Sequence, residues 1–358
     1  MAKSDCKVKL GVSLYSYQTD VKLGKMSLED CFAHIASTGA KGVEIVPEQT
    51  LTDFQYETID EEFVDYWNGL VAKYDLTPTN VGYYDDYDVF PNRELNLQER
   101  FARFKHGVKL SKALGMRSIR ATSEMPLELL EKCMKYAGDQ GLLYIMEIHS
   151  PYSMKSTYCQ DWLELIDKNN AVSFAGIYPD CGTFAKGPML GRVRQALRAG
   201  AKQDIIDFLQ EEYEKATKRF QSEAKIIDLG LYRDVVAYGM AEPFAKAIEM
   251  GGSTLETDLF RRLNYDDPRW MLEYKPYIKH MHAKFYNMEP DGKGGFHDPA
   301  IDLEGAMEVL REGDFDIFVS TEYEGQGSYM DLDYEGDGPE SRDLVEKEQK
   351  LMASILYK

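Results

Sequence analysis

The sequence predicts an α/β fold, a single (β/α)8 TIM barrel, from two observations. Eight short segments rich in β-branched and aromatic residues are each followed by a segment of helical periodicity. In the second half, four successive strands end in residue types that bind metals, and barrels gather functional residues at the carboxyl ends of their strands. The rival architecture is an open doubly wound sheet, but Ser16-Tyr17-Gln18 after the first strand offers no Gly-rich phosphate loop.

The first half of the chain contains four strand-helix units. β-forming residues predict strands at residues 8–17, 42–47, 77–84 and 117–121. Helical periodicity and end signals predict helices at residues 28–37, 61–74 and 97–114, and a fourth that Pro126 opens. Ser27 is the expected cap of the first of these helices, and Gly39 is expected to end it.

The fifth strand, at residues 142–150, reads Leu-Leu-Tyr-Ile-Met-Glu-Ile-His-Ser and is the centre of the predicted site. Its apolar run predicts a strand buried on both faces, as in a parallel sheet. Glu147 and His149 are two residues apart, so their side chains project to the same side of the strand. A buried carboxylate requires a partner or a metal, which makes the ends of the neighbouring strands informative.

The remaining units follow the same pattern, apart from one long connection. Strands are predicted at residues 172–178, 277–285 and 315–322, and helices at residues 161–167, 303–310 and 344–356. The segment 183–276 contains far more residues than an ordinary connection between two strands of a barrel. Within it, the pattern of residues 204–220 predicts an amphipathic helix. We therefore expect one barrel domain over residues 1–358, with 183–276 as a helical insertion or cap.

The charge balance excludes some partners. With 42 Lys and Arg against 61 Asp and Glu, the formal net charge is −19, which repels nucleic acid and anionic membranes. The start of the chain lacks an apolar signal core, and no apolar run reaches the length of a membrane span. The five scattered cysteines are typical of reduced thiols, and we expect a cytoplasmic protein.

Four strand ends together predict a metal site. They carry Glu147, Asp180, His282 and Glu322 on the fifth to eighth strands. Three carboxylates and one imidazole suit Mn²⁺, Mg²⁺ or Co²⁺, whereas zinc usually has more nitrogen or sulfur ligands. Each residue alone has a plain structural explanation, such as a salt bridge or an Asx turn at Asp180, but four adjacent strand ends favour a metal.

These residues resemble those of the xylose isomerase-like TIM-barrel superfamily of sugar isomerases and epimerases, whose barrels carry Glu, Asp, His and Glu on the same strands. Glu147-Ile-His149, the segment Asp180-Cys-Gly-Thr-Phe184 and the long 183–276 stretch look most like the catalytic α subunit of bacterial C-glycoside deglycosidases. The resemblance implies that Glu147, Asp180, His282 and Glu322 hold Mn²⁺. It also implies that His149 is the general acid or base, that Glu147 and Glu322 are catalytic, and that a small β-rich second subunit completes a hetero-oligomer.

The implied reaction is a lyase reaction on a glycoside. A metal chelated by the ketone and a neighbouring hydroxyl of a 3-oxo-C-glycoside stabilises an enediolate when the C2 proton is removed, and the aglycone carbon is eliminated from C1.

The alternatives are a sugar or sugar-phosphate isomerase or epimerase, and a non-catalytic barrel subunit that binds a partner. Ketohexose epimerases carry Asp-x-x-His after the sixth strand, whereas Thr183 stands at the histidine position here. The endonuclease branch needs more histidines than the six present. Candidate substrate-binding residues are Lys284, Thr183 and Tyr323.

Overall fold

The computed structural model describes residues 6–47, 59–121, 125–229, 236–326 and 340–358. Eight parallel strands form the central sheet, in the order β6-β5-β4-β3-β2-β1-β10-β7. They are β1 (Lys9–Ser13), β2 (Gly42–Ile45), β3 (Thr77–Tyr83), β4 (Ser118–Ala121), β5 (Leu143–Ile148), β6 (Ala175–Pro179), β7 (His280–Phe285) and β10 (Phe318–Tyr323). Parallel bridges from Ile177 to Ile278 and from Asp180 to His282 join the two end strands, so the sheet is a nearly closed barrel.

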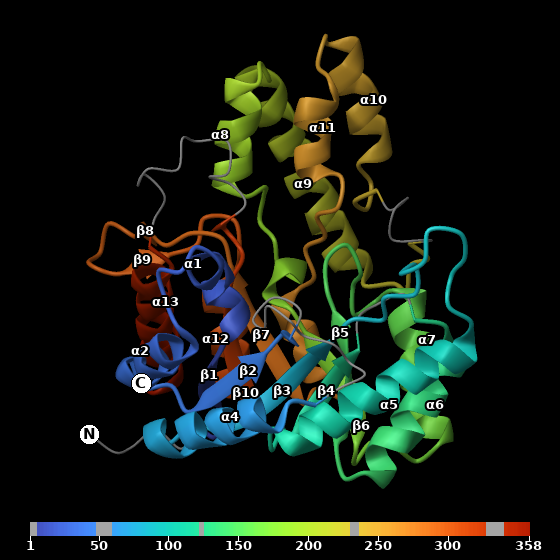
Figure 1. Cartoon of the computed structure of the whole chain (residues 1–358). Coiled ribbons are helices and arrows are strands. Elements are labelled where there is room, and N and C mark those ends of the chain that lie inside the picture. Colours follow the sequence, from blue (N-terminus) through green and yellow to red (C-terminus); the bar gives the residue numbers. More distant parts are fainter. Residues whose placement is uncertain (1–5, 48–58, 122–124, 230–235, 327–339) are drawn as a thin grey trace.

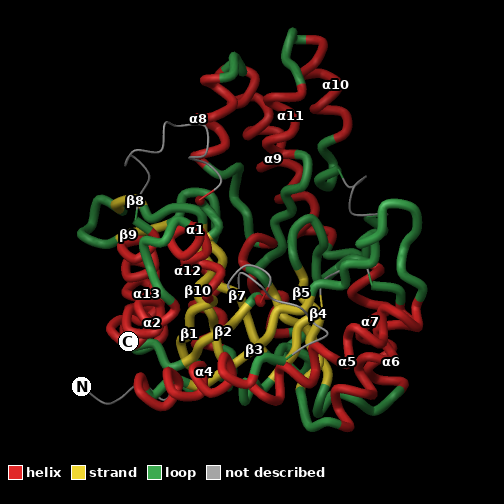
Figure 2. Tube along the Cα trace, in the orientation of Figure 1, coloured by secondary structure: helices red, strands yellow, loops and turns green. Residues whose placement is uncertain are grey.

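Helices surround this barrel, as Figures 1 and 2 show. They are α1 (Gln18–Lys22), α2 (Leu28–Thr38), α4 (Glu61–Tyr74), α5 (Leu97–Ala113), α6 (Leu127–Asp139), α7 (Thr157–Lys168), α12 (Leu303–Glu312) and α13 (Ser341–Leu356). The predicted end signals of α2 are confirmed, because the Ser27 side chain accepts a hydrogen bond from the Asp30 backbone and Gly39 has φ 88°. The predicted (β/α)8 barrel is therefore the observed fold.

Two predicted boundaries differ from the structure by four residues, more than the other element ends do. The first strand ends at Ser13 and continues as the 3₁₀ helix η1 (Leu14–Tyr17), because Ser16 exchanges side-chain hydrogen bonds with the backbone of β10. The helix expected at 161–167 begins earlier, at Thr157, because the Ser156 side chain accepts a hydrogen bond from the Cys159 backbone and caps it.

The connection from β6 to β7 is mainly helical. After the 3₁₀ turn η2 (Cys181–Thr183) it contains α8 (Leu190–Arg198), α9 (Gln203–Glu223), α10 (Ala241–Glu249), α11 (Thr254–Phe260) and η4 (Pro268–Leu272). We call α8 to α11 the helical group. It has a hydrophobic cluster of its own, which includes Ile205, Leu209, Tyr213 and Phe260. In Figure 1 it stands beyond the end of the barrel where β6 leads into η2. Its role as a cap stays a prediction.

A short antiparallel hairpin, β8 (Glu289–Pro290) and β9 (Phe296–His297), follows β7 outside the main sheet. Within the described ranges, no helix combines the length and the apolar character needed to span a membrane.

Candidate metal centre

The structure brings the four predicted metal ligands together at one end of the barrel. Glu147 and Glu322 lie near the carboxyl ends of β5 and β10, His282 lies in β7, and Asp180 follows β6. All four are buried, and one potential ligand atom from each lies within 4.8 Å of the others. Parallel strands end on the same side of a barrel, so residues separated by as many as 175 positions (322 − 147 = 175) meet in one place.

The spacing of these atoms suits a single ion. Nδ1 of His282 lies 3.0 Å from Oε1 of Glu147, 3.2 Å from Oε2 of Glu322 and 3.7 Å from Oδ2 of Asp180. Neighbouring ligands of an octahedral ion with bonds of about 2.1 Å are themselves about 3 Å apart. In addition, Asp180 Oδ2 is buried and accepts no hydrogen bond from the described residues, and the Lys284 ammonium faces it only at 3.4 Å, which leaves this oxygen able to bind an ion. The donor set therefore fits a divalent cation.

The electrostatics of the cluster also favour an added cation. Burial alone would lower the pKa of His282, but Glu322 and Glu44 outweigh it and hold that pKa well above its usual range. Burial raises the pKa of Glu322, with His282 opposing the shift. Both shifts favour a bound proton, and a proton on either residue reduces the excess negative charge of the cluster. A divalent ion at the same place would balance that charge instead.

Glu44 is part of this site, although the sequence analysis did not identify it. It lies in β2 and is fully buried, and its Oε1 is 2.7 Å from Nε2 of His282. Its Oε2 accepts a hydrogen bond of 2.6 Å from the Tyr178 hydroxyl. A carboxylate on the outer nitrogen of a histidine ligand fixes the ring and leaves the other nitrogen to the metal. The available signal was a lone Glu in the otherwise apolar Gly-Val-Glu-Ile-Val stretch.

Arg120 in β4 is a second contributor that the sequence analysis missed. Its Nη1 lies 2.5 Å from Oε2 of Glu147, and both side chains are almost completely buried. Burial alone would raise the pKa of Glu147, but Arg120 outweighs it and holds that pKa far below its usual range. A methyl group on Gly82 would lie 2.9 Å from Arg120 Nη2, so the missing side chain at Gly82 makes room for the guanidinium.

His149 and Lys284 form a pair beside the cluster. Nζ of Lys284 lies 2.6 Å from Nε2 of His149, and Nδ1 of His149 contacts the Ser150 carbonyl. Burial opposes the charge on Lys284, but Asp180 and Glu324 hold its pKa well above the usual range. A charged lysine can only donate, so His149 Nε2 accepts a hydrogen bond from it and Nδ1–H donates one to the Ser150 carbonyl. This arrangement describes a neutral His149.

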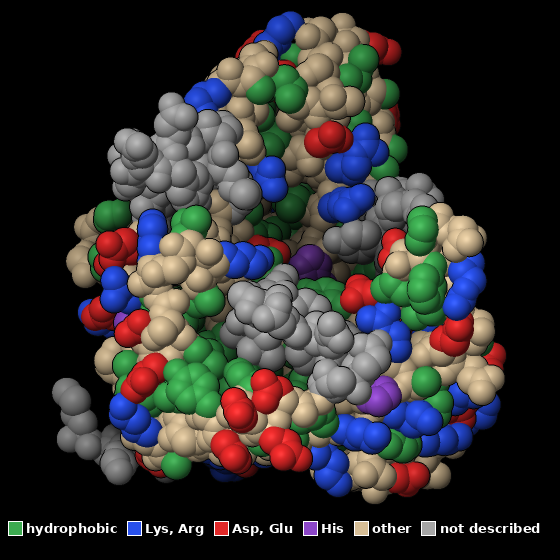
Figure 3. Space-filling view, in the orientation of Figure 1, with side chains coloured by type: hydrophobic (Ala, Val, Ile, Leu, Met, Phe, Trp, Pro, Cys, Tyr) green, Lys and Arg blue, Asp and Glu red, His purple; other side chains and the backbone are tan. Residues whose placement is uncertain are grey.

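The other two candidate substrate residues, Thr183 and Tyr323, are buried close to the site. The Thr183 hydroxyl donates a hydrogen bond of 2.8 Å to the Asp180 carbonyl, and the Tyr323 ring packs against Phe285 with centroids 5.3 Å apart. Their role in substrate binding stays a prediction. Figure 3 shows the surface hollowed between the helical group and the barrel, with a histidine side chain at the floor of the hollow.

Curated proteins with similar sequences are named for deglycosidases. Two C-glycoside deglycosidase α subunits of Arthrobacter globiformis are 26% and 23% identical over 96% and 88% of this chain, and over 91% and 83% of their own lengths. A 3'-dehydrocarminate deglycosidase α subunit of a Microbacterium species is 24% identical over 88% of both chains. No family model matches the sequence. The resemblance to C-glycoside deglycosidase α subunits is confirmed at this level of identity.

Solved structures with the same fold are named for sugar isomerases and epimerases. A sugar phosphate isomerase/epimerase of Parabacteroides distasonis matches with a TM-score of 0.54 and 14% identity, over 100% of this chain and 98% of that one. The D-allulose 3-epimerase of a Methylomonas species, in complex with D-allulose, matches with a TM-score of 0.52 and 13% identity, over 98% of this chain and 97% of that one. At such identities the likeness concerns the fold.

Proposed function

We propose that this protein is the catalytic subunit of a divalent-metal-dependent C-glycoside deglycosidase, a lyase that cleaves the bond between the sugar and the aglycone carbon of 3-oxo-C-glycosides. The observation that carries the proposal is the buried cluster of Glu147, Asp180, His282 and Glu322 with His149 beside it. The names of the curated relatives support the choice of substrate. We also propose a cytoplasmic location, which the five scattered cysteines favour and which cell fractionation would test.

The four clustered residues would hold the ion, with Mn²⁺ as the proposed metal. A bound divalent ion would supply Lewis-acid stabilisation of the negative charge that develops on the sugar oxygens. Glu44 would orient His282 toward the ion through its 2.7 Å contact, and Arg120 would keep Glu147 ionised. The charged Lys284 would offset part of the negative charge of the cluster, where it lies 3.4 Å from Asp180.

His149 would move the proton. Its Nε2 would take the proton from C2, the C2–H electron pair would form the C1=C2 double bond, and the C1–aglycone bond would break. The aglycone carbon would keep the electron pair of the broken C1–aglycone bond and receive the proton from His149, so the step has no net proton change. Lys284 occupies Nε2 in the structure, so the substrate must replace this contact before His149 acts as a base.

The second candidate function is sugar isomerisation or epimerisation. Removal of a proton next to the carbonyl of a free ketose by the same residues would give either product. Thr183, at the position where ketohexose epimerases carry a histidine, favours the lyase. The third candidate is a non-catalytic barrel subunit, which requires no bound metal.

A product assay separates these candidates. The purified protein, supplied with Mn²⁺, is offered 3-oxo-C-glycosides, free ketoses and sugar phosphates, and the products are identified by chromatography and NMR. We expect release of the aglycone together with the unsaturated sugar. Conversion of ketoses alone would establish the isomerase, and no conversion by the protein with or without a co-purifying partner would favour the binding subunit.

Two variants test the assigned roles. Asp180→Asn should remove most metal, measured by elemental analysis, because it replaces a ligand carboxylate, while circular dichroism shows an intact fold. His149→Gln should retain the metal and lose about 10² to 10⁴ in rate, the usual contribution of a positioned acid or base. Full metal occupancy in Asp180→Asn would contradict the proposed metal site. Near-normal turnover in His149→Gln would mean that a carboxylate such as Glu322, and not His149, transfers the proton.

A further inference from the structure

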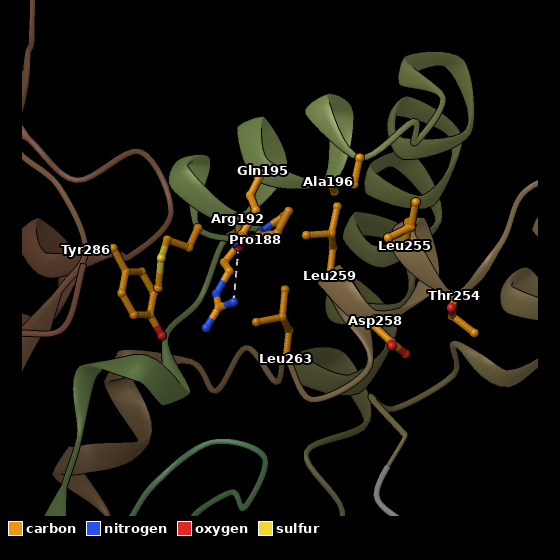
Figure 4. A pocket seen from close by; sticks show the side chains of 12 residues that line it. Pro188, Arg192, Gln195, Ala196, Thr254, Leu255, Asp258, Leu259, Leu263 and Tyr286 are labelled. Atoms are coloured by element: carbon orange, nitrogen blue, oxygen red, sulfur yellow. Dashed lines mark hydrogen bonds between the residues drawn. The ribbon is translucent and has the colours of Figure 1, made fainter. Parts of the chain in front are cut away.

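A cavity of about 590 Å³ lies between α8 and α11 of the helical group, with Tyr286 of the barrel on one side. Figure 4 shows that its walls come from α8, from α11 and from Tyr286, which directly follows β7. The lining residues are Pro188, Met189, Arg192, Gln195, Ala196, Ala199, Thr254, Leu255, Asp258, Leu259, Leu263 and Tyr286. This volume lies within the range of about 300 to 1,000 Å³ that is usual for small-molecule sites.

The lining combines an apolar wall with one available cation. Leu255, Leu259 and Leu263 supply apolar surface from α11 and the residues after it. Arg192 donates a hydrogen bond of 3.2 Å to the Gln195 amide, and in the described part of the chain it forms no ion pair with a carboxylate. The lining carboxylate Asp258 is already paired with Arg261 at 3.0 Å. Arg192 is therefore available to an anionic group of a ligand.

Tyr286 connects this cavity with the metal centre. A methyl group on Gly182 would lie 3.8 Å from the Tyr286 hydroxyl, 3.4 Å from Cδ of Lys284 and 2.6 Å from Oδ1 of Asp180. The Tyr286 backbone donates a hydrogen bond of 2.6 Å to the buried Asp298, which fixes the start of this loop. Tyr286 therefore lines the cavity and also reaches with its hydroxyl to Gly182, beside Asp180 and Lys284.

We propose that this cavity binds the non-sugar part of the substrate, a flat aromatic group with an acidic substituent. The sugar would lie at the metal centre, Tyr286 would contact the junction, the leucines would cover the aromatic faces, and Arg192 would bind the carboxylate or phenolate. This inference rests on the proposed function, because only a glycoside places an aglycone next to the reacting sugar.

The test measures binding rather than turnover. Anthraquinone-2-carboxylate and its uncharged carboxamide are titrated by calorimetry into the full-length protein, in EDTA so that the carboxylate cannot bind a metal ion instead of Arg192. We expect the wild type to prefer the carboxylate about tenfold, the scale of one added hydrogen bond to a charged group. Arg192→Gln should abolish that preference. Leu263→Trp, which fills the cavity, should weaken both probes.

Arg194→Gln is the matched control, because Arg194 lies on the same helix, faces Glu289 at 3.7 Å and does not line the cavity. It should bind both probes as the wild type does. If Arg192→Gln keeps the preference, or if both arginine variants lose it equally, the proposed site is wrong whatever the product assay shows. If Arg192 governs probe binding but no glycoside is cleaved, the binding site stands and its role in deglycosylation is wrong.

Discussion

At the scale of single residues, the site depends on how His282 is oriented. Its two ring nitrogens face carboxylates on opposite sides, Glu44 on Nε2 at 2.7 Å and Glu147 on Nδ1 at 3.0 Å. Glu44 also accepts a hydrogen bond from the Tyr178 hydroxyl, so its own position depends on β6, which is not adjacent to β2 in the barrel. In this arrangement Glu44 acts on the metal only through the histidine that it positions.

The first prediction follows from that contact. Glu44→Gln should weaken Mn²⁺ binding about 10- to 100-fold, the usual effect of removing a partner of a histidine ligand. Competition with a fluorescent chelator measures the affinity, and circular dichroism reports the fold. Glu324→Gln is the control, because Glu324 pairs with Lys284 at 2.9 Å and, among the described residues, forms no hydrogen bond or ion pair with His282. Equal affinity of Glu44→Gln and the wild type would exclude a positioning role.

At the scale of elements, a short segment before η4 secures the loop that carries the proposed base. The Asp266 backbone donates a hydrogen bond of 2.8 Å to the Thr183 carbonyl, and its Oδ2 accepts one of 2.8 Å from the Met154 backbone. Asn264 contacts the Pro151 carbonyl in the same loop. Asp266 therefore links the loop after β5 with η2, on which the positions of His149 and Asp180 depend.

The second prediction concerns the pH dependence of stability. Burial raises the pKa of Asp266 to about 7, opposed by Ser153, the Met154 backbone and Lys155, whereas Asp267 adds to the shift. Between about pH 4 and pH 7 the folded state retains a proton that the unfolded chain has lost, so this residue makes the free energy of unfolding fall as pH rises. The contribution is at most about 4 kcal/mol.

Asp266→Asn should remove that contribution, because an amide has no carboxyl proton to lose. Urea unfolding at several pH values between 5.5 and 7.5 should show a smaller decline for the variant than for the wild type. If the free energy of unfolding changed with pH by the same amount in the variant and in the wild type, Asp266 would be ionised in the folded state throughout this range.

At the scale of the whole molecule, two hydrophobic clusters lie side by side. The larger one fills the barrel and the space beneath its helices, and the smaller one lies within the helical group. Since the proposed aglycone cavity lies between α8 and α11, its shape depends on the smaller cluster.

The third prediction tests whether the smaller cluster is a separate unit of stability. Leu209→Ala removes a fully buried side chain of α9 and should cost about 2 to 5 kcal/mol. Hydrogen exchange should become faster in α9 to α11 while the barrel strands keep their protection. Leu310→Ala, in the larger cluster, is the matched variant and should instead reduce the protection of the barrel. Uniform loss of protection in Leu209→Ala would indicate a single cooperative unit.

The fourth prediction concerns assembly. The relatives are named α subunits, and we propose that this chain also works with a small β-rich partner in a hetero-oligomer. The isolated chain should therefore be less active than the complex obtained by co-expression, with masses measured by light scattering. Full activity of the isolated chain as a monomer would contradict the proposed partner.

The sequence by itself determined the barrel and the meeting of four ligand-type residues. Strand and helix periods are local properties, and the strands of a parallel barrel end on the same side, so Glu147, Asp180, His282 and Glu322 could be placed together without coordinates. Element ends were less predictable, as at Ser16, where a hydrogen bond to a strand about 300 residues away ends the first strand early.

Only the tertiary structure decided which other residues complete the site. Glu44 and Arg120 lie on β2 and β4, and their contacts with His282 and Glu147 arise when the barrel closes. The alternation of residues along a strand shows on which face a Glu or Arg side chain lies. It does not show which residue of another strand that side chain contacts. The cavity beside Tyr286 depends likewise on how α8 and α11 pack, which no local pattern specifies.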